Sequence, residues 1–152
     1  MRNIYKLFLL LTFISGFTNI INAQVNWDNS NFDKIIIKAA SLDKLVMIDF
    51  YTDWCIPCKQ VLKVIFTDDT AIVRFVNNKY ICTKINAEKD EGIKLAKKYN
   101  VGGFPTILFL DKNKNVIGRI EGTLARDNYF KAIKTAGNSE EKTNNSETKI
   151  EK

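Results

Sequence analysis

Histidine is absent from all 152 residues of this chain. Its absence excludes Ser-His and Cys-His catalytic pairs, histidine metal ligands and the haem motif in which histidine follows Cys-x-x-Cys. Cysteine is also scarce, with three residues. Zinc sites usually need four ligands, whereas here a single Cys-x-x-Cys pair is accompanied only by Cys82. The sequence therefore predicts no metal site, and it lacks a flavin or nicotinamide fingerprint, so no cofactor is expected.

A dense basic stripe is missing too. The formal net charge is +6, and without residues 1–23 the chain has 21 Lys and Arg against 17 Asp and Glu. The lysines are scattered along the chain, which is typical of a solvated surface. We therefore expect no nucleic-acid partner, and nothing in the composition requires more than a monomer.

Both ends of the chain differ from its middle. Residues 1–23 have a basic start, an apolar run from Leu7 to Phe17 and a small residue, Ala23, at a plausible cleavage site, which predicts a secretory signal peptide. The run is shorter than the ~20 residues of a spanning helix, although an uncleaved membrane anchor is the alternative. Residues 138–152 have one apolar side chain and predict a disordered polar tail. The folded domain is expected over residues 24–137.

The middle of the chain alternates between helical and strand patterns. The near-continuous apolar run 45–51 is typical of a strand covered on both faces. Alternation that ends in a hairpin, with a polar turn in which Asn113 takes positive φ, predicts an α/β mixed sheet with helices on both faces. The expected elements are a helix after the cap-type residues 28–30, a strand at 45–51, a helix at 55–66, a second helical piece capped by 67–70, a strand at 79–85, a helix at 90–99 with Ile93 on its apolar face, strands at 106–110 and 116–120, and a helix at 126–136.

The pair Cys55 and Cys58 lies where the buried strand ends and a helix begins. A helix N-terminus carries partial positive charge and unpaired N–H groups, which favour a thiolate and lower the pKa of Cys55. Cys58 lies one turn further in and is expected to be less exposed, in position to attack a mixed disulfide formed at Cys55. A bridge across so short a loop removes little entropy from the unfolded chain, so a redox role is favoured over a structural one.

The stretch Trp54-Cys-Ile-Pro-Cys-Lys59 resembles the active site of the thioredoxin family. Other motifs of that family follow in order: Phe104-Pro105-Thr106 resembles the cis-proline loop, Asp49 its buried acid, Lys84 the lysine that partners this acid, and Gly122 the glycine after the last strand. The similarity covers roughly residues 25–136. It implies a thioredoxin fold, a central mixed β-sheet flanked by helices on both faces, and thiol–disulfide oxidoreductase activity.

The resemblance also implies roles for single residues. Cys55 and Cys58 are the expected catalytic cysteines, and Asp49 is expected to accept the proton of Cys58 through water or directly, with Lys84 beside it. A buried carboxylate without a partner has a raised pKa, although a structural ion pair with Lys84 is the alternative for Asp49. The expected substrate-binding residues, with core packing as the alternative for Trp54, are Trp54, Ile56, Pro57, Phe104 and Pro105.

Two residues near these motifs are expected to be passive. Cys82 alternates with its neighbours on a strand and is expected to be a buried, inert thiol. Asp53 is expected to be exposed at the end of the strand, where it only tunes the local charge.

The departures from the family pattern leave the direction of electron flow open. Ile56 replaces a glycine, and the dipeptide between the cysteines influences redox poise. The split helix, Thr-Asp-Trp-Cys and the signal peptide resemble exported domains such as the C-terminal domain of DsbD-type proteins. This resemblance implies a periplasmic reductase of protein disulfides, re-reduced by a membrane electron donor of DsbD type. The alternatives are a disulfide oxidase or isomerase, and a non-catalytic module that binds partners or Cu(I) through its two thiols.

Overall fold

The computed structural model describes residues 24–139. The predicted signal peptide lies outside this range, as does the predicted tail apart from its first two residues. Within residues 24–139, no helix is long and apolar enough to cross a membrane. In chain order the elements are α2 Phe32–Ser41, β1 Leu45–Tyr51, α3 Ile56–Val64, α4 Thr70–Lys79, β2 Tyr80–Asn86, α5 Asp90–Lys98, β3 Thr106–Leu110, β4 Val116–Glu121 and α6 Arg126–Gly137.

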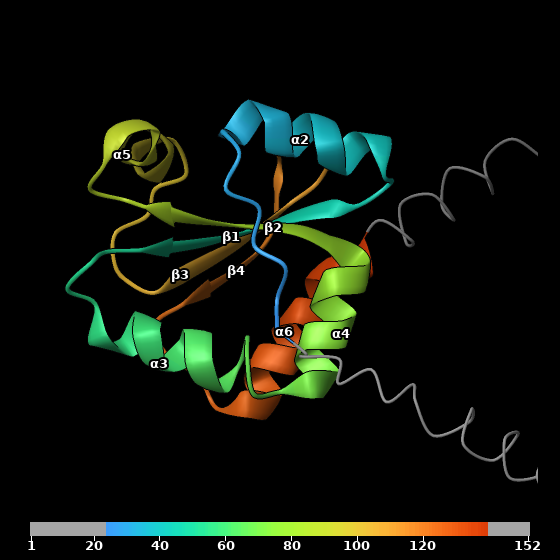
Figure 1. Cartoon of the computed structure of the whole chain (residues 1–152), viewed down its shortest axis with the longest axis vertical. Coiled ribbons are helices and arrows are strands. Elements are labelled where there is room, and N and C mark those ends of the chain that lie inside the picture. Colours follow the sequence, from blue (N-terminus) through green and yellow to red (C-terminus); the bar gives the residue numbers. More distant parts are fainter. Residues whose placement is uncertain (1–23, 140–152) are drawn as a thin grey trace, which may run out of the picture.

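The strands form one mixed sheet in the spatial order β2-β1-β3-β4 (Figure 1). β1 runs parallel to β2 and antiparallel to β3, and β3 and β4 form the antiparallel hairpin. The predicted order of elements is confirmed. β1 has its predicted bounds, whereas β2 begins at Tyr80, one residue later than expected.

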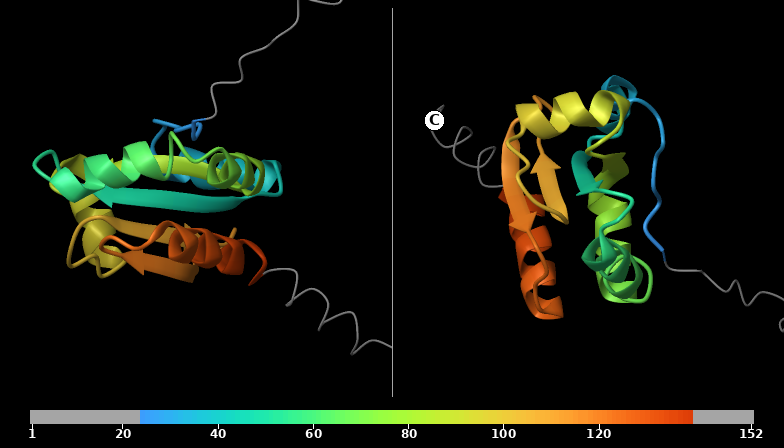
Figure 2. Two further views of the ribbon diagram at one scale, coloured as in Figure 1. Left: turned by 90° about the horizontal axis from the view of Figure 1, so that it is seen from below. Right: turned by 90° about the vertical axis from the view of Figure 1, so that its left-hand side faces the viewer.

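Helices cover both faces of the sheet. α2 and α5 lie on one face, and α3, α4 and α6 lie on the other (Figures 1 and 2). Alternate residues of β1 therefore enter two separate cores, with Ile48 and Phe50 under α2 and α5, and Leu45 and Met47 under the other three helices. By the same alternation Asp49 belongs to the face that bears α3.

The helix after the cysteines is split, as the sequence predicts. Asp69 is the N-cap of α4, and its carboxylate accepts the backbone N–H groups of Ala71 and Ile72 at 3.1 and 3.0 Å. Arg126 of α6 forms an ion pair with the same carboxylate. Asp69 thus starts the second piece and ties it to the last helix.

Helix α5 contacts the sheet through Gly92 rather than Ile93. A Cβ at position 92 would lie 2.0 Å from the backbone oxygen of Asn86, so only glycine permits this approach. Ile93 is 55% exposed, and its predicted place on the buried face is wrong. The pattern at 90–99 is misleading because the buried side of this helix is formed by small residues together with Leu95.

The turn between β3 and β4 is organised by Asp111. Its Oδ1 accepts the N–H groups of Asn113 and Asn115, each at 2.8 Å. Lys114 takes positive φ, at 67°, so the expectation for Asn113 is wrong. The carboxylate of Asp111 holds the N–H of Asn113, and the chain reverses one residue later.

Candidate active site

Cys55 is the N-cap of α3, where the chain leaves β1. Its Sγ accepts the backbone N–H of Cys58 at 3.1 Å, and its own N–H donates to the carbonyl of Thr52 at 3.2 Å. The two cysteines are joined by a disulfide. Pro57 is exposed in the first helical turn, where its missing N–H leaves no helical hydrogen bond unmade. One sulfur is therefore held at a helix N-terminus by a backbone donor, which favours negative charge on it.

The expectation that Cys58 is less exposed than Cys55 is wrong in this disulfide form. Cys55 is 2% exposed and Cys58 is 5% exposed. Trp54 and Ile56 flank Cys55 in the chain, and the Phe104 ring contacts the ring of Trp54. Access to Cys55 therefore depends on these neighbours as well as on its place at the helix start.

Asp49 lies in the middle of β1 and is 3% exposed. Its Oδ1 is one of two buried side-chain oxygens in the described residues without a hydrogen-bond partner. Burial raises the pKa of Asp49 to about 7, and the positive charge of Lys84 opposes this rise. A carboxyl group with this pKa can exchange a proton near neutral pH.

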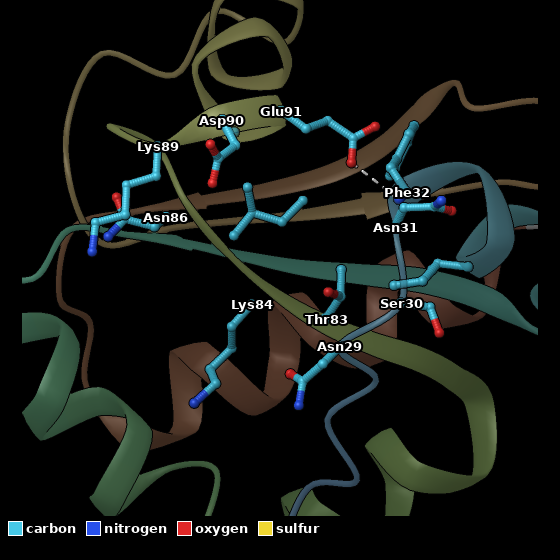
Figure 3. A pocket seen from close by; sticks show the side chains of 13 residues that line it. Asn29, Ser30, Asn31, Phe32, Thr83, Lys84, Asn86, Lys89, Asp90 and Glu91 are labelled. Carbon is cyan, nitrogen blue, oxygen red and sulfur yellow. Dashed lines mark hydrogen bonds between the residues drawn. The ribbon is translucent and has the colours of Figure 1, made fainter.

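Lys84 is opposite Asp49 in the β1–β2 ladder. Figure 3 shows its side chain extending from β2 on the side of the sheet where α3 lies, away from Asp90 and Glu91. Among the ion pairs of residues 24–139 none joins Lys84 to Asp49, and the Lys84 ammonium lies over the Trp27 ring, 5.4 Å from its centroid. The alternative of a structural ion pair is therefore wrong, and Lys84 acts on Asp49 only through its field.

A cavity of about 340 Å³ connects these groups to the cysteine pair. The residues that line it come from β1, β2, α3 and the loop between β1 and α3: Asp49, Tyr51, Thr52, Asp53, Cys58, Lys59, Leu62 and Lys84. It thus brings together Asp49, Lys84 and Cys58, which lie apart in the sequence. Cys55 does not line it.

An apolar rim surrounds the disulfide at the surface. Trp54 and Ile56 are each 66% exposed, so the alternative of core packing for Trp54 is wrong. The rings of Trp54 and Phe104 meet edge to face with centroids 6.2 Å apart. Exposed aromatic and aliphatic groups beside a reactive disulfide can contact an apolar partner segment.

The loop before β3 lies beside this rim. The peptide bond between Phe104 and Pro105 is cis, and Pro105 is buried. Gly122, whose φ is 71°, donates its N–H to the Pro105 carbonyl at 2.8 Å, and the Tyr129 hydroxyl donates to the Gly122 carbonyl at 3.0 Å. The end of β4 and α6 thus hold this loop in place.

The sequence did not predict two groups of this site, Glu88 and Thr52. Glu88, in the loop between β2 and α5, accepts the indole N–H of Trp54 with both carboxylate oxygens at 3.1 Å. Beside it, Lys89 forms an ion pair of 2.6 Å with Asp53, whose side chain is 62% exposed as expected. Thr52 is the second missed group, because its hydroxyl is buried although the residue follows the strand. A separation of 34 residues gives no sequence signal for the contact between Glu88 and Trp54.

A second hollow lies at the outer edge of β2, away from the disulfide. It has about 450 Å³ and is lined by the segment before α2 and the start of α5 (Figure 3). One hydrogen bond crosses it, from the Phe32 N–H to the Glu91 carboxylate at 3.2 Å. The edge is open here because, of the described residues 24–31, Trp27 alone forms a β-bridge with β2, at Cys82. No cysteine is among the residues that line this hollow.

Cys82 faces the core between β2 and the helices α3, α4 and α6. It is a free thiol with 1% exposure, and burial raises its pKa. The expectation of a buried thiol is confirmed.

Comparisons with known proteins agree with this geometry. The thioredoxin family model matches residues 23–135. The thiol:disulfide interchange protein DsbD of Yersinia pestis (strain Pestoides F) is 40% identical over 81 residues, which cover 53% of this chain and 14% of that protein. The chain thus matches about a seventh of the length of this relative.

Solved structures of other proteins also resemble this chain. The solution structure of a candidate disulphide-isomerase from Bacteroides thetaiotaomicron has a TM-score of 0.68 and 32% identity, and covers 76% of this chain and 95% of that one. The oxidised C-terminal domain of DsbD from Neisseria meningitidis, at 22% identity and a TM-score of 0.55, shares the fold, with coverage of 70% and 94%. The chain therefore belongs to the thioredoxin family and carries the Cys-x-x-Cys thiol–disulfide oxidoreductase centre of that family.

Proposed function

We propose that this protein reduces disulfide bonds of exported proteins, with Cys55 as the nucleophile and Cys58 as the resolving cysteine. The observation that carries the proposal is the place of Cys55 at the start of α3, where its sulfur accepts the N–H of Cys58. A thiolate at this position is stabilised by the helix N-terminus and is the attacking species in disulfide exchange.

The reaction consists of two exchanges. The Cys55 thiolate attacks one sulfur of a substrate disulfide, a mixed disulfide forms, and the other substrate sulfur leaves as a thiolate. Cys58 then loses its proton and attacks Cys55, so the second substrate sulfur leaves and the Cys55–Cys58 disulfide forms. The substrate gains two electrons, and the cysteine pair loses two.

The groups around the pair have separate tasks in this proposal. Asp49 accepts the proton of Cys58, because it lines the same cavity and its pKa is about 7. The positive charge of Lys84 stabilises the ionised form of Asp49. The substrate segment contacts Trp54, Ile56, Pro57 and Pro105 and pairs with the backbone of Phe104.

Each turnover leaves the pair oxidised, so a reductant must restore the thiols. We infer that a membrane electron donor of DsbD type fills this role, since the chain resembles one domain of such proteins. The proposal places the protein in the periplasm, with residues 1–23 as the export signal. Isolation of the protein from cell fractions, followed by mass measurement of its N-terminus, tests both the place and the cleavage.

The first experiment is the equilibrium reduction potential of the Cys55–Cys58 pair in glutathione buffers. A value near about −270 mV, as in thioredoxin, supports a reductase that needs an electron supply. A value between about −120 and −180 mV overturns the proposed direction and indicates an oxidase or isomerase. The similarity to the Bacteroides thetaiotaomicron candidate disulphide-isomerase makes isomerisation the second candidate function.

A further inference from the structure

Thr52 lines the cavity beside Cys58 and carries a buried hydroxyl group. Its side chain is 1% exposed, and its hydroxyl has no hydrogen-bond partner among the described residues. The same is true of Oδ1 of Asp49, and these are the two buried side-chain nitrogen or oxygen atoms of residues 24–139 in this condition. Leaving such a group unpaired costs about 1–3 kcal/mol, so two such groups on residues that line one cavity indicate a common partner.

The cavity has room for that partner. Its volume of about 340 Å³ is far above the roughly 15 Å³ that a water molecule requires, and Asp49, Thr52 and Cys58 all line it. A water molecule between a hydroxyl, a carboxylate and a thiol has the two to four polar partners that hold buried water in place.

The backbone of Thr52 is held in place by its neighbours. Its carbonyl accepts the N–H of Cys55 at 3.2 Å, so the backbone of Thr52 is tied to the helix start that carries the nucleophile. β1 ends one residue earlier, at Tyr51, and the chain turns there into α3. Thr52 is therefore held against both the Asp49 strand and the cysteine helix.

We propose that Thr52 positions the water molecule through which Asp49 takes the proton of Cys58 in the resolving step. The inference rests on the proposed exchange function and adds a positioning residue to it. The Cys58 thiol donates its proton to this water, and the water donates a proton to the Asp49 carboxylate. The Cys58 thiolate then attacks Sγ of Cys55, the Cys55–Cys58 bond forms, and the bond from Cys55 to the substrate sulfur breaks.

Three of the other titratable or charged groups near this path are engaged with different partners. The titratable and charged groups that face Asp49 and Cys58 from the surrounding elements are Tyr51, Asp53, Lys59, Lys84 and Tyr129. Asp53 is engaged with Lys89, and the ammonium of Lys84 lies over the Trp27 ring. Tyr129 donates its hydroxyl to the carbonyl of Gly122.

The test uses the full reduced protein and an aromatic disulfide, dithiobis(nitrobenzoate), whose thiol product absorbs visible light. Attack by Cys55 releases the first coloured thiol, and attack by Cys58 on the resulting mixed disulfide releases the second. Stopped-flow absorbance resolves the two phases, and their rates are measured across pH. The first phase reports on Cys55 and serves as an internal control for general damage to the fold.

In Thr52→Val we expect the second phase to slow about tenfold near neutral pH and its pH midpoint to rise, with the first phase unchanged. Thr52→Ser should retain the wild-type profile, and Thr52→Ala should behave like Thr52→Val. Thr52→Ser and Thr52→Ala differ from each other only by the hydroxyl group. Comparing these two variants therefore tests the role of the hydroxyl even if Thr52→Val does not fold. Thr83 is a buried threonine of β2, and it points to the opposite face of the sheet from its neighbour Lys84, which lines the cavity. Thr83→Val should therefore change neither phase.

Equal second-phase profiles in Thr52→Ser and Thr52→Ala would overturn the role of Thr52, as would equal slowing of both phases. The proposed direction of electron flow fails separately, through the reduction potential, because the two phases occur in reductases and oxidases alike. Wild-type protein that released no coloured thiol would overturn both proposals.

Discussion

The three cysteines of this domain are buried to nearly the same degree but lie in two different environments. Cys55 and Cys58 are 2% and 5% exposed, and Cys82 is 1% exposed. The first two lie at a helix N-terminus, where a backbone N–H points at Sγ of Cys55 and an unpaired carboxylate lines the cavity beside Cys58. Cys82 lies in a strand among apolar side chains. Burial therefore does not separate a reactive thiol from an inert one here. The difference lies in the donors and proton acceptors nearby.

Removing one thiol from each environment should give the largest difference between them. Cys55→Ser should lower the turnover of a disulfide substrate at least about a thousandfold, because the nucleophile is lost. Cys82→Ala should leave turnover within about twofold and lower the free energy of unfolding by about 1 kcal/mol, because it leaves only a small cavity. Substrate reduction with an excess of dithiol reductant measures turnover, and urea denaturation measures stability. A similar loss of turnover in both variants would show that the two environments do not differ in function.

Within the reactive pair, the two sulfurs should also differ from each other. Cys58→Ser leaves the nucleophile at the helix start but removes the group that resolves its mixed disulfide. We expect this variant to accumulate covalent adducts with substrate, whereas Cys55→Ser accumulates none. Non-reducing electrophoresis and intact mass measurement detect these adducts. Adducts that form equally through either cysteine would contradict the assignment of Cys55 as the nucleophile.

Asp49 gives the reactive environment a pH dependence below neutral pH, whereas the raised pKa of Cys82 acts only in the alkaline range. The pKa of Asp49 is about 7 in the folded protein and 3.8 in its ordinary state. Between these values the folded protein holds a proton that the unfolded chain has lost, so stability falls as pH rises from about 4 to 7 and is constant above. Asp49→Asn should remove this slope and raise the free energy of unfolding by about 2–4 kcal/mol near pH 8.

Urea denaturation at a series of pH values measures this effect. The matched control is Asp53→Asn, since this carboxylate is exposed and Lys89 lowers its pKa. We expect the slope between pH 4 and 7 to persist in the control. A slope that persisted in Asp49→Asn would show that Asp49 is not the group that titrates.

The smallest expected effect on the kinetics concerns the apolar rim beside the disulfide, where Glu88 contacts Trp54. Glu88→Ala removes the acceptor of the Trp54 indole N–H and should raise KM less than about fivefold, with kcat unchanged, because an exposed hydrogen bond stabilises little. Glu88→Gln keeps an acceptor oxygen and should behave like the wild type. Steady-state kinetics with a peptide disulfide separate the two parameters. A fall in kcat in Glu88→Ala would place Glu88 in the chemical step instead of the rim.

The parts of the fold that follow from local pattern could be predicted from the sequence. The apolar run at Leu45–Tyr51 needed no knowledge of the rest of the chain, nor did the cap at Asp69 that divides the helix after the cysteines. Ile93 was misplaced because periodicity counts apolar residues, whereas the close approach of α5 to β2 selects Gly92. Asn113 was misjudged because the side chain of Asp111, two residues away, decides which residue of the turn takes positive φ.

The candidate site likewise has parts that a local sequence pattern predicts and parts that depend on tertiary packing. The reactive pair could be predicted from the sequence, because a strand followed by Cys-x-x-Cys and a helix places one sulfur at a helix N-terminus whatever surrounds it. The sequence also indicated Asp49, because a carboxylate within a buried strand is costly and therefore conspicuous. Three relations depend on the packing of distant segments: Glu88 accepts the indole N–H of Trp54, Lys84 acts on Asp49 without an ion pair, and the buried Thr52 lines one cavity with Asp49. These relations join β1, β2 and the loops at their ends, and the distances between such segments are set by the packing of the sheet rather than by any local pattern.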